Sequence, residues 1–316
     1  MHQKHLLTLL DWSTEDLKDV LDYAHRMKAL LKQEGTLKHT LADRTLALLF
    51  EKSSMRTRVS FEVAMTQLGG ASLYLSKSDV NLGKREPVKD GARVMARYVD
   101  AISARVYEHA MVEELAEFSD VPVINALSNR AHPCQALADV MTVEERFKDL
   151  SEVTVSYVGD ANNVARSLAT ACVMLGAEFR IAAPAGYQFE QHFLELVGEC
   201  AAENDGEITQ IRSPKEAARG AHVLYTDTWV SMGQEGEADQ RLQDLSGFCI
   251  DSELLSLAAP DCIVMHCLPA YRGNEITDEV MEGPASAVWD QAENRLHAQR
   301  ALLELMMTAK EQCAGS

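Results

Sequence analysis

Cationic side chains occupy a place in this chain where helices disfavour them. In the stretch FEKSSMRTRVSFE, residues 50–62, Arg56 and Arg58 follow two serines at the point where an apolar run ends and a helix is predicted to begin. A helix N-terminus carries partial positive charge, so it favours an anion and disfavours a cation by about 0.3–1 kcal/mol. Backbone N–H groups, serine hydroxyls and a guanidinium at one helix start together suit a phosphate. The alternative is a capped helix with two solvated arginines.

Polar residues also follow two later strands of the same region. Arg105 lies at the end of a predicted strand whose other residues are apolar, and burying an arginine is costly unless an anion or a carboxylate meets it. His132 and Gln135 flank Pro133 at a predicted helix start, where both side chains can donate hydrogen bonds to a carbonyl oxygen. The alternatives are an internal ion pair for Arg105 and local helix capping by the stretch HPCQ.

The second half of the chain offers a different set of polar groups at its strand ends. The turn VGDANNVA lacks the GxGxxG spacing, so it does not predict a dinucleotide site. Its Asn162 and Asn163 either cap the next helix or bind the carboxylate and amine of an amino acid. Asp227, in DTWVSMG, offers a carboxylate to a cation, with Ser231 close by. Cys267, in HCLPAYRG, brings a thiol to the same edge, although a buried, inert cysteine is the commoner case.

Two series of short β-rich runs, each alternating with helical patterns, must position these groups. This alternation predicts an α/β protein of two domains, each a mostly parallel sheet flanked by helices, with the active site in the cleft between them. The predicted strands are 45–50, 71–75, 101–106 and 121–127, then 153–159, 179–183, 207–211, 222–226 and 262–266. We expect the first domain at 1–133, an interdomain helix at 134–150 and the second domain at 151–294. A C-terminal helix at about 295–316 is expected to dock back on the first domain.

Composition excludes several classes of function. The 30 Lys and Arg residues against 48 Asp and Glu give a net charge of −18, which argues against nucleic acid or an anionic membrane as a partner. No apolar run approaches the roughly 20 residues that span a bilayer. The seven cysteines are scattered and form no CxxC pair, which suits reduced thiols in the cytoplasm and gives no zinc-ligand spacing. The cysteines thus predict a cytoplasmic protein without a zinc site, and we expect no metal or other cofactor.

Four motifs occur in a fixed order along the chain: SMRTR, HPCQ, DTWVSMG and HCLPA. Each is weak alone, but the ordered set is specific, and it resembles the aspartate/ornithine carbamoyltransferase family, within it the ornithine carbamoyltransferases. The similarity runs from FEK at 50 to AENR at 292–295. The family commonly has STRTR where this chain has SMRTR. Met55 therefore lacks a hydroxyl, and a phosphate contact there has to come from its backbone N–H.

The resemblance implies transfer of the carbamoyl group of carbamoyl phosphate to the δ-amine of L-ornithine, giving L-citrulline and phosphate, as in arginine biosynthesis. The residues implied in catalysis are Arg56, Arg105, His132, Asp227, Cys267 and Arg295. Those implied to bind carbamoyl phosphate are Ser54, Met55, Arg56, Thr57, Asn81, Arg105, His132, Gln135, Cys267, Leu268 and Arg295. Those implied to bind L-ornithine are Asn163, Asp227, Ser231 and Met232.

The resemblance also implies a homotrimer, or a multiple of trimers, with shared active sites. The segment 76–90 is polar, contains glycine and is too long for the usual connections of an α/β unit, so it predicts a functional loop. In the family the matching loop reaches into the neighbouring subunit's phosphate pocket, which would place Asn81 there. The alternative is a mobile surface loop.

Other functions remain open. Within the family, N-acetylornithine, N-succinylornithine and putrescine are the competing substrates. Outside it, two α/β domains also describe a ligand-binding protein, and Cys267 with His266 suggests a cysteine hydrolase. Adjacent residues on a strand point to opposite faces, which argues against that pair. The proton of the attacking amine can pass to Asp227 with Cys267, or to the departing phosphate.

Overall fold

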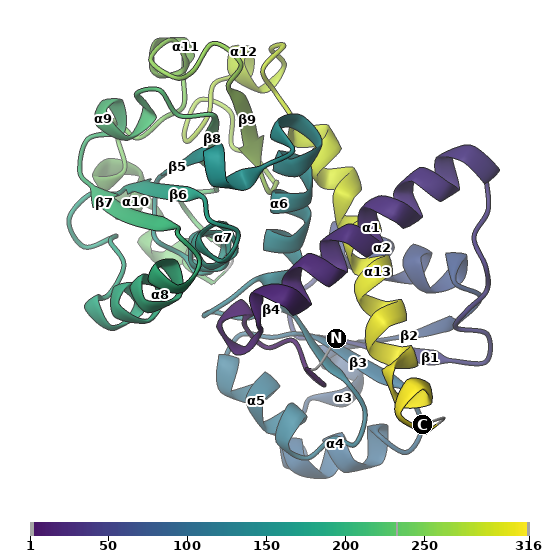
Figure 1. Ribbon diagram of the computed structural model, residues 1–316. Helices are drawn as coiled ribbons and strands as arrows, with labels where there is room; N and C mark the ends of the chain where they lie inside the picture. The colour runs from purple at the N-terminus through teal and green to yellow at the C-terminus, as the bar shows by residue number, and fades with distance from the viewer. Residues whose placement is uncertain (1–2, 232, 315–316) are drawn as a thin grey trace. The chain divides into compact units, whose positions relative to one another are not determined.

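The computed structural model describes residues 3–231 and 233–314, without the side chains of 235 and 309–314. The chain forms two compact units, residues 1–138 with 293–316 and residues 139–292 (Figure 1). Two helices, α6 (Pro133–Phe147) and α13 (Val288–Ala314), each continue from one unit into the other.

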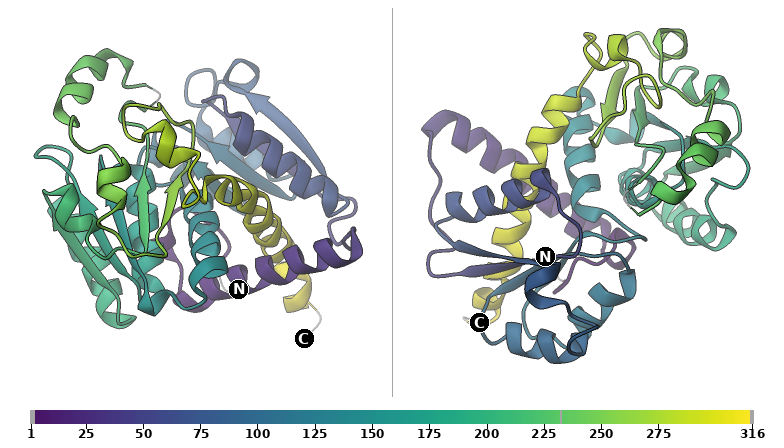
Figure 2. Two further views of the ribbon diagram at one scale, coloured as in Figure 1. Left: turned by 90° about the horizontal axis from the view of Figure 1, so that it is seen from above. Right: turned by 180° about the vertical axis from the view of Figure 1, so that it is seen from behind.

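The first unit contains a four-stranded parallel sheet in the order β2-β1-β3-β4. Its strands are β1 (Thr45–Phe50), β2 (Ala71–Ser76), β3 (Ala101–Arg105) and β4 (Val123–Leu127). Its helices, besides parts of α6 and α13, are η1 (Leu9–Asp11), α1 (Thr14–Glu34), α2 (Met55–Gln67), α3 (Lys77–Val80), α4 (Val88–Met95) and α5 (His109–Glu117). Helices α1, α2 and α13 lie over one face of the sheet, and α4 and α5 lie over the other (Figures 1 and 2).

Burial explains the strand sequences of this sheet. The central strands β1 and β3 are buried along almost their whole length, as expected for parallel strands covered on both faces, and they read as apolar runs. The edge strand β2 instead has exposed residues at alternate positions near its start. The helices begin at polar caps: the Ser13 hydroxyl accepts a hydrogen bond from Asp16 N at the start of α1 (3.1 Å).

The second unit contains a five-stranded parallel sheet in the order β7-β6-β5-β8-β9. Its strands are β5 (Thr154–Val158), β6 (Glu178–Ala182), β7 (Glu207–Ile211), β8 (Val223–Thr226) and β9 (Ile263–His266). Its helices, besides parts of α6 and α13, are η2 (Leu150–Glu152), α7 (Asn163–Met174), α8 (Gln191–Glu203), α9 (Pro214–Ala218), η3 (Glu235–Glu237), α10 (Ala238–Asp244), α11 (Ser252–Leu255) and α12 (Asp278–Met281). Helices α7 and α8 cover one face, and α9 and α11 the other (Figure 1).

The predicted fold class is confirmed, and the nine predicted strands are present with ends that differ by at most two residues. The segment 76–90, however, is not one long loop, because it contains α3. Ser76 N donates a hydrogen bond to Asp79 Oδ2 (2.7 Å), a capping arrangement that starts this short helix. Asn81 ends the helix with a φ of 50°. No helix among the described residues is both long and apolar enough to cross a membrane.

Each sheet has one point where the strand order reverses. In the first sheet β2 and β3 lie on opposite sides of β1. In the second sheet β6 and β8 lie on opposite sides of β5. Ligands of open α/β sheets bind preferentially at the carboxyl ends of the strands at such a switch point. The residues that follow β1, β3, β5 and β8 are therefore the first candidates for function.

Candidate active site

At the switch point of the first unit, Ser54 starts α2. Its hydroxyl accepts a hydrogen bond from Thr57 N (3.3 Å) and donates one to Thr57 Oγ1 (3.0 Å). Met55 is the first residue of the helix, and its side chain is 71% exposed. The apolar Met55 side chain gives an anion no hydrogen bond, so the polar group at this position is the backbone N–H.

The two arginines of this helix start have different surroundings. Arg58 forms an ion pair with Glu62, with 2.9 Å between Nε and Oε1, and its guanidinium lies 3.9 Å from the ring centroid of Tyr74. Arg56 is half-buried, and its positive charge acts on His132. Local partners thus explain Arg58, and Arg56 alone belongs to the candidate site.

Arg295 joins three helices of the first unit. From α13 its Nη2 donates to Thr57 Oγ1 on α2 (2.8 Å), and its Nη1 donates to Gln135 Oε1 on α6 (3.1 Å). Its side chain is almost fully buried. The structure therefore brings Arg295, Thr57 and Gln135 together, although they are far apart in the sequence.

Arg105 ends β3 next to the same switch point. It pairs with Phe50 of β1 on one side and with Leu127 of β4 on the other. The register with β4 shifts between Ala104 and Arg105, an irregularity of the kind that redirects side chains at strand ends. The guanidinium is almost fully buried, so the fold holds a second cation in a place with little water.

His132 lies among these cations. Its pKa is well below the ordinary value of 6.5, first because the ring is buried, and then because of the positive charges of Arg295, Arg105 and Arg56. Protonating the ring would add another positive charge to this cluster. At neutral pH the imidazole is therefore uncharged, and it can still donate a hydrogen bond from one nitrogen.

A buried network holds the turn that leads to His132. The Ser128 hydroxyl lies 2.7 Å from His109 Nδ1 and accepts a hydrogen bond from Ala131 N (3.3 Å). Asn125 Nδ2 also donates to this hydroxyl (3.1 Å). The residue before His132 is thus held by Ser128, whose hydroxyl is held in turn by Asn125 of β4 and His109 of α5. No pattern in the sequence indicates this support.

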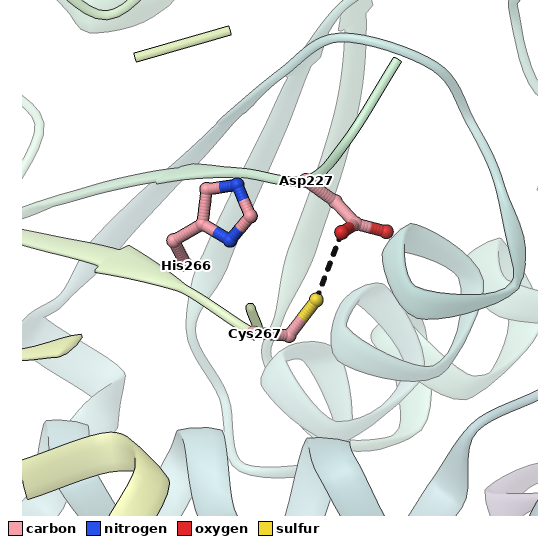
Figure 3. Close-up of side chains that lie close together, drawn as sticks. All are labelled: Asp227, His266 and Cys267. Carbon is pink, nitrogen blue, oxygen red and sulfur yellow. Dashed lines mark hydrogen bonds between the residues drawn. The ribbon is translucent and has the colours of Figure 1, made fainter. Parts of the chain in front are cut away.

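At the switch point of the second unit, the Asp227 carboxylate accepts three hydrogen bonds. The donors are Cys267 Sγ at 2.9 Å, Asn162 Nδ2 at 2.8 Å and Thr228 N at 2.7 Å. Thr226 pairs with His266 in the sheet, so the next residue of each strand, Asp227 and Cys267, lie side by side. Figure 3 shows the thiol pointing at the carboxylate. The thiol is therefore a hydrogen-bond donor in this arrangement.

The two neighbouring asparagines differ in role. Asn162 Oδ1 accepts hydrogen bonds from Val164 N (2.9 Å) and Ala165 N (3.0 Å), so it caps α7, while its amide nitrogen binds Asp227. Asn163 is the first residue of α7 and is half-buried. The sequence left open whether these asparagines cap the helix or bind an amino acid, and the structure assigns capping to Asn162.

The segment that carries Ser231 forms a turn beside a pocket. Ser231 N donates to Gln234 Oε1, and Gln234 N donates to Ser231 O, both at 3.0 Å. The pocket has a volume of about 280 Å³, and Ser231, Trp229, Leu242 and Tyr271 are among its lining residues. Met232, predicted to bind ornithine, lies outside the described residues.

His266 and Cys267 lie closer together than the sequence argument allowed. Asp227, His266 and Cys267 hold their possible metal-ligand atoms within 4.8 Å of one another, so the expectation of opposite faces is wrong. Cys267 follows the last residue of β9, and Leu268 has a φ of 61°, so strand alternation no longer applies. His266 Nδ1 accepts from Leu268 N (2.9 Å), and Nε2 lies 3.1 Å from Glu275 Oε1. Both ring nitrogens are thus engaged, which argues against a base or metal ligand.

Comparisons with known proteins match two parts of the chain to one family. Residues 4–145 match the family model for the carbamoyl-P binding domain of aspartate/ornithine carbamoyltransferase. Residues 151–306 match the model for the Asp/Orn binding domain of the same family.

Relatives and solved structures cover nearly the whole chain. The ornithine carbamoyltransferase of Methanoculleus marisnigri is 52% identical over 95% of this chain and 96% of its own. The structure of ornithine carbamoyltransferase from Pyrococcus furiosus is 48% identical, covers 96% of both chains and has a TM-score of 0.93. The structure of anabolic ornithine carbamoyltransferase from Campylobacter jejuni is 40% identical, covers 98% of this chain and 100% of its own, and has a TM-score of 0.91.

We expect the His132 ring to stay neutral as the pH falls through 6.5, where an ordinary histidine becomes charged, because its pKa is well below 6.5 in the folded protein. The measurement is ¹⁵N NMR of the histidine side chains, with His132→Gln to assign the signal. In the unfolded protein the same ring should titrate near the reference value of about 6.5. A ring that charges between pH 7 and 6 in the folded protein would contradict the cation cluster.

Proposed function

The chain belongs to the aspartate/ornithine carbamoyltransferase family, and we propose that it transfers the carbamoyl group of carbamoyl phosphate to the δ-amine of L-ornithine, giving L-citrulline and phosphate. The observation that carries this function is the gathering of Arg56, Arg105 and Arg295 around a neutral His132. Arg56, Arg105 and His132 lie within the matched carbamoyl-P binding region, and Arg295 reaches them from α13. A dianion with a carbonyl group requires this combination of charge and donors. That both half-sites share one cleft stays a prediction.

In the first unit, Ser54, the Met55 backbone, Arg56, Thr57 and Arg105 are proposed to bind the phosphate. The start of α2 adds N–H groups and partial positive charge to the guanidiniums. His132, Gln135 and Arg295 are proposed to bind the carbamoyl end. Their support is the hydrogen bonding of Arg295 to both Thr57 and Gln135, which connects the helix start to the start of α6.

Attack by the amine turns the planar carbamoyl carbon into a tetrahedral intermediate with negative charge on its oxygen. Donors that are in place before the reaction stabilise this charge without reorganising, and one such donor is worth about 2.7–4 kcal/mol in a known case. Neutral His132 suits this task because it donates without adding a cation to the cluster. Arg56 and Arg105 are proposed to stabilise the phosphate as the C–O bond breaks.

In the second unit, Asn163, Asp227, Ser231 and Met232 are proposed to bind ornithine, with Cys267 and Leu268 beside the reacting groups. A carboxylate that is almost fully buried and held by three donors is a strong partner for an ammonium group. The attacking amine has to be uncharged, and an amine of this type has a reference pKa of about 10.4. Asp227 with Cys267, or the departing phosphate, takes the proton.

The biosynthetic direction is the one we propose, because the relatives from Pyrococcus furiosus and Campylobacter jejuni are named anabolic enzymes. We also propose a cytoplasmic location. The six cysteines whose side chains the structure describes are all free thiols, which suits a reducing compartment.

Citrulline formation tests the proposed function. The purified protein is given carbamoyl phosphate with ornithine, N-acetylornithine, N-succinylornithine or putrescine, and both products are measured. We expect ornithine to be the preferred amine by at least about a hundredfold in kcat/KM, because Asp227 suits a free ammonium group. Preference for another amine would show that ornithine is not the substrate. No turnover with any of the four amines would contradict the proposed function.

Arg56 and Arg58 form a matched pair of variants. Arg56→Gln should raise the KM for carbamoyl phosphate and lower kcat, with a combined loss of about a hundredfold or more in kcat/KM, because its charge meets both substrate and transition state. Arg58→Gln should stay within about threefold of the wild type, since Arg58 is bound to Glu62 and Tyr74 at the surface. Steady-state kinetics measure both. Equal effects in the two variants would remove Arg56 from the site.

A homotrimer with shared sites is also proposed. Apolar side chains of α2 and the edge strand β2 face solvent: Met55 is 71% exposed, Leu73 52% and Val59 48%. The segment with Asn81 follows β2 directly and belongs to the same part of the unit. Such an apolar surface favours association, and it lies beside the proposed phosphate-binding residues.

Mixed trimers test this arrangement. Asn81→Glu should repel carbamoyl phosphate in the neighbouring subunit's site, while Arg295→Ala should disable the site of its own chain, so each variant alone should be nearly inactive. Unfolding the two together and reassembling them creates some sites with intact Asn81 and intact Arg295, and activity should return. Tagged mixed trimers that form but stay as inactive as their parents would show that Asn81 serves its own chain.

A further inference from the structure

Gln291, in the first turn of α13, has a buried amide that joins three elements of the second unit. Its Nε2 donates to Asp139 Oδ1 on α6 (2.7 Å) and to the Tyr225 hydroxyl on β8 (3.1 Å). Its Oε1 accepts from the backbone N–H of His266 on β9 (2.9 Å). The side chain is fully buried, and both polar atoms of the amide have partners.

Asp139 and Tyr225 complete this network. The Tyr225 hydroxyl donates to Asp139 Oδ2 (3.1 Å), so both oxygens of the fully buried carboxylate accept hydrogen bonds. Burial, followed by the charge of Asp139, raises the pKa of Tyr225 well above its ordinary value, which keeps the hydroxyl protonated. A satisfied buried network of this kind holds its elements in one arrangement, whereas a broken one is costly.

Two chains of contacts lead from this network to the proposed ornithine-binding residues. His266, whose N–H binds Gln291, is the residue directly before Cys267. β9 is an edge strand, so this N–H has no further strand to bind, and the Gln291 amide takes that place. By the second route, the Tyr225 ring stacks on Tyr157 (5.5 Å between centroids), and the Tyr157 hydroxyl lies 3.5 Å from Asn162 Oδ1. Both routes thus reach partners of Asp227.

We propose that Gln291 is a positioning residue that fixes the end of β9 and so places Cys267 against Asp227 for ornithine. The role rests on the proposed function, because it concerns the amine half of that reaction. Gln291 does not touch the reacting groups; it acts through the His266 backbone and through Asp139 with Tyr225. Its loss should therefore affect ornithine far more than carbamoyl phosphate.

An exchange of the amide and the carboxylate tests this role. Gln291→Glu keeps an acceptor for His266 N but loses both donors and sets a second carboxylate against Asp139. We expect the KM for ornithine to rise at least about tenfold, while the affinity for carbamoyl phosphate, measured by calorimetry, stays within about twofold. Asp139→Asn, which removes one acceptor without changing size, should raise the same KM less.

The double variant Gln291→Glu with Asp139→Asn restores one amide and one carboxylate in reversed positions. It should return the KM for ornithine to within about threefold of the wild type, a rescue that loss of packing would not give. If Gln291→Glu does not fold, the comparison of Asp139→Asn with the double variant still tests the role.

Two outcomes would overturn the proposal. The first is a folded Gln291→Glu or Asp139→Asn enzyme with an unchanged KM for ornithine. The second is a loss that falls equally on carbamoyl phosphate affinity, since the network would then support the protein in general. Wild-type turnover is measured in parallel, and its absence would instead contradict the proposed function.

Discussion

Burial of positive charge is the constraint on which the first unit depends. Arg105 is 6% exposed and Arg295 is 4% exposed, and moving such ions out of water costs several kcal/mol each. The fold adds the positive end of α2 to the same place, which increases that cost. The proposed dianionic ligand is attracted by each of these positive charges, so the same groups that are costly to bury favour its binding. The neutral state of His132 follows from the same charges.

The second unit depends on a buried carboxylate, that of Asp227, and on the hydrogen bonds that it accepts. Asp227 is almost fully buried, and its carboxylate oxygens accept three hydrogen bonds from the chain itself. The thiol of Cys267 is one of the donors. Positively charged side chains and a carboxylate thus occur at the switch points of two separate sheets, which is the separation that the proposed transfer between two substrates requires.

Strands such as TLALLF at 45–50 could be predicted because burial on both faces demands an uninterrupted apolar run. Arg56 and Arg58 could not be distinguished, since the difference depends on Glu62 and Tyr74, whose side chains the fold brings to Arg58. The relation of His266 to Cys267 was predicted wrongly, because strand alternation ends where the strand ends. Gln291 gave no signal at all: its partners lie 152, 66 and 25 residues away, and a single glutamine in a helical pattern reads as a solvated residue.

Spacing along two continuous helices connects these features. On α6, Gln135 and Asp139 are four residues apart; on α13, Gln291 and Arg295 are four residues apart. Residues with this spacing lie on one face of a helix. Gln135 and Arg295 bind each other in the first unit, and Asp139 and Gln291 bind each other in the second. One inserted residue would rotate the later positions by about 100° and separate the two functions. A kink between Gln291 and Arg295 would likewise turn one side chain away from its partner on α6. This explains why α13 runs through both units without glycine or proline.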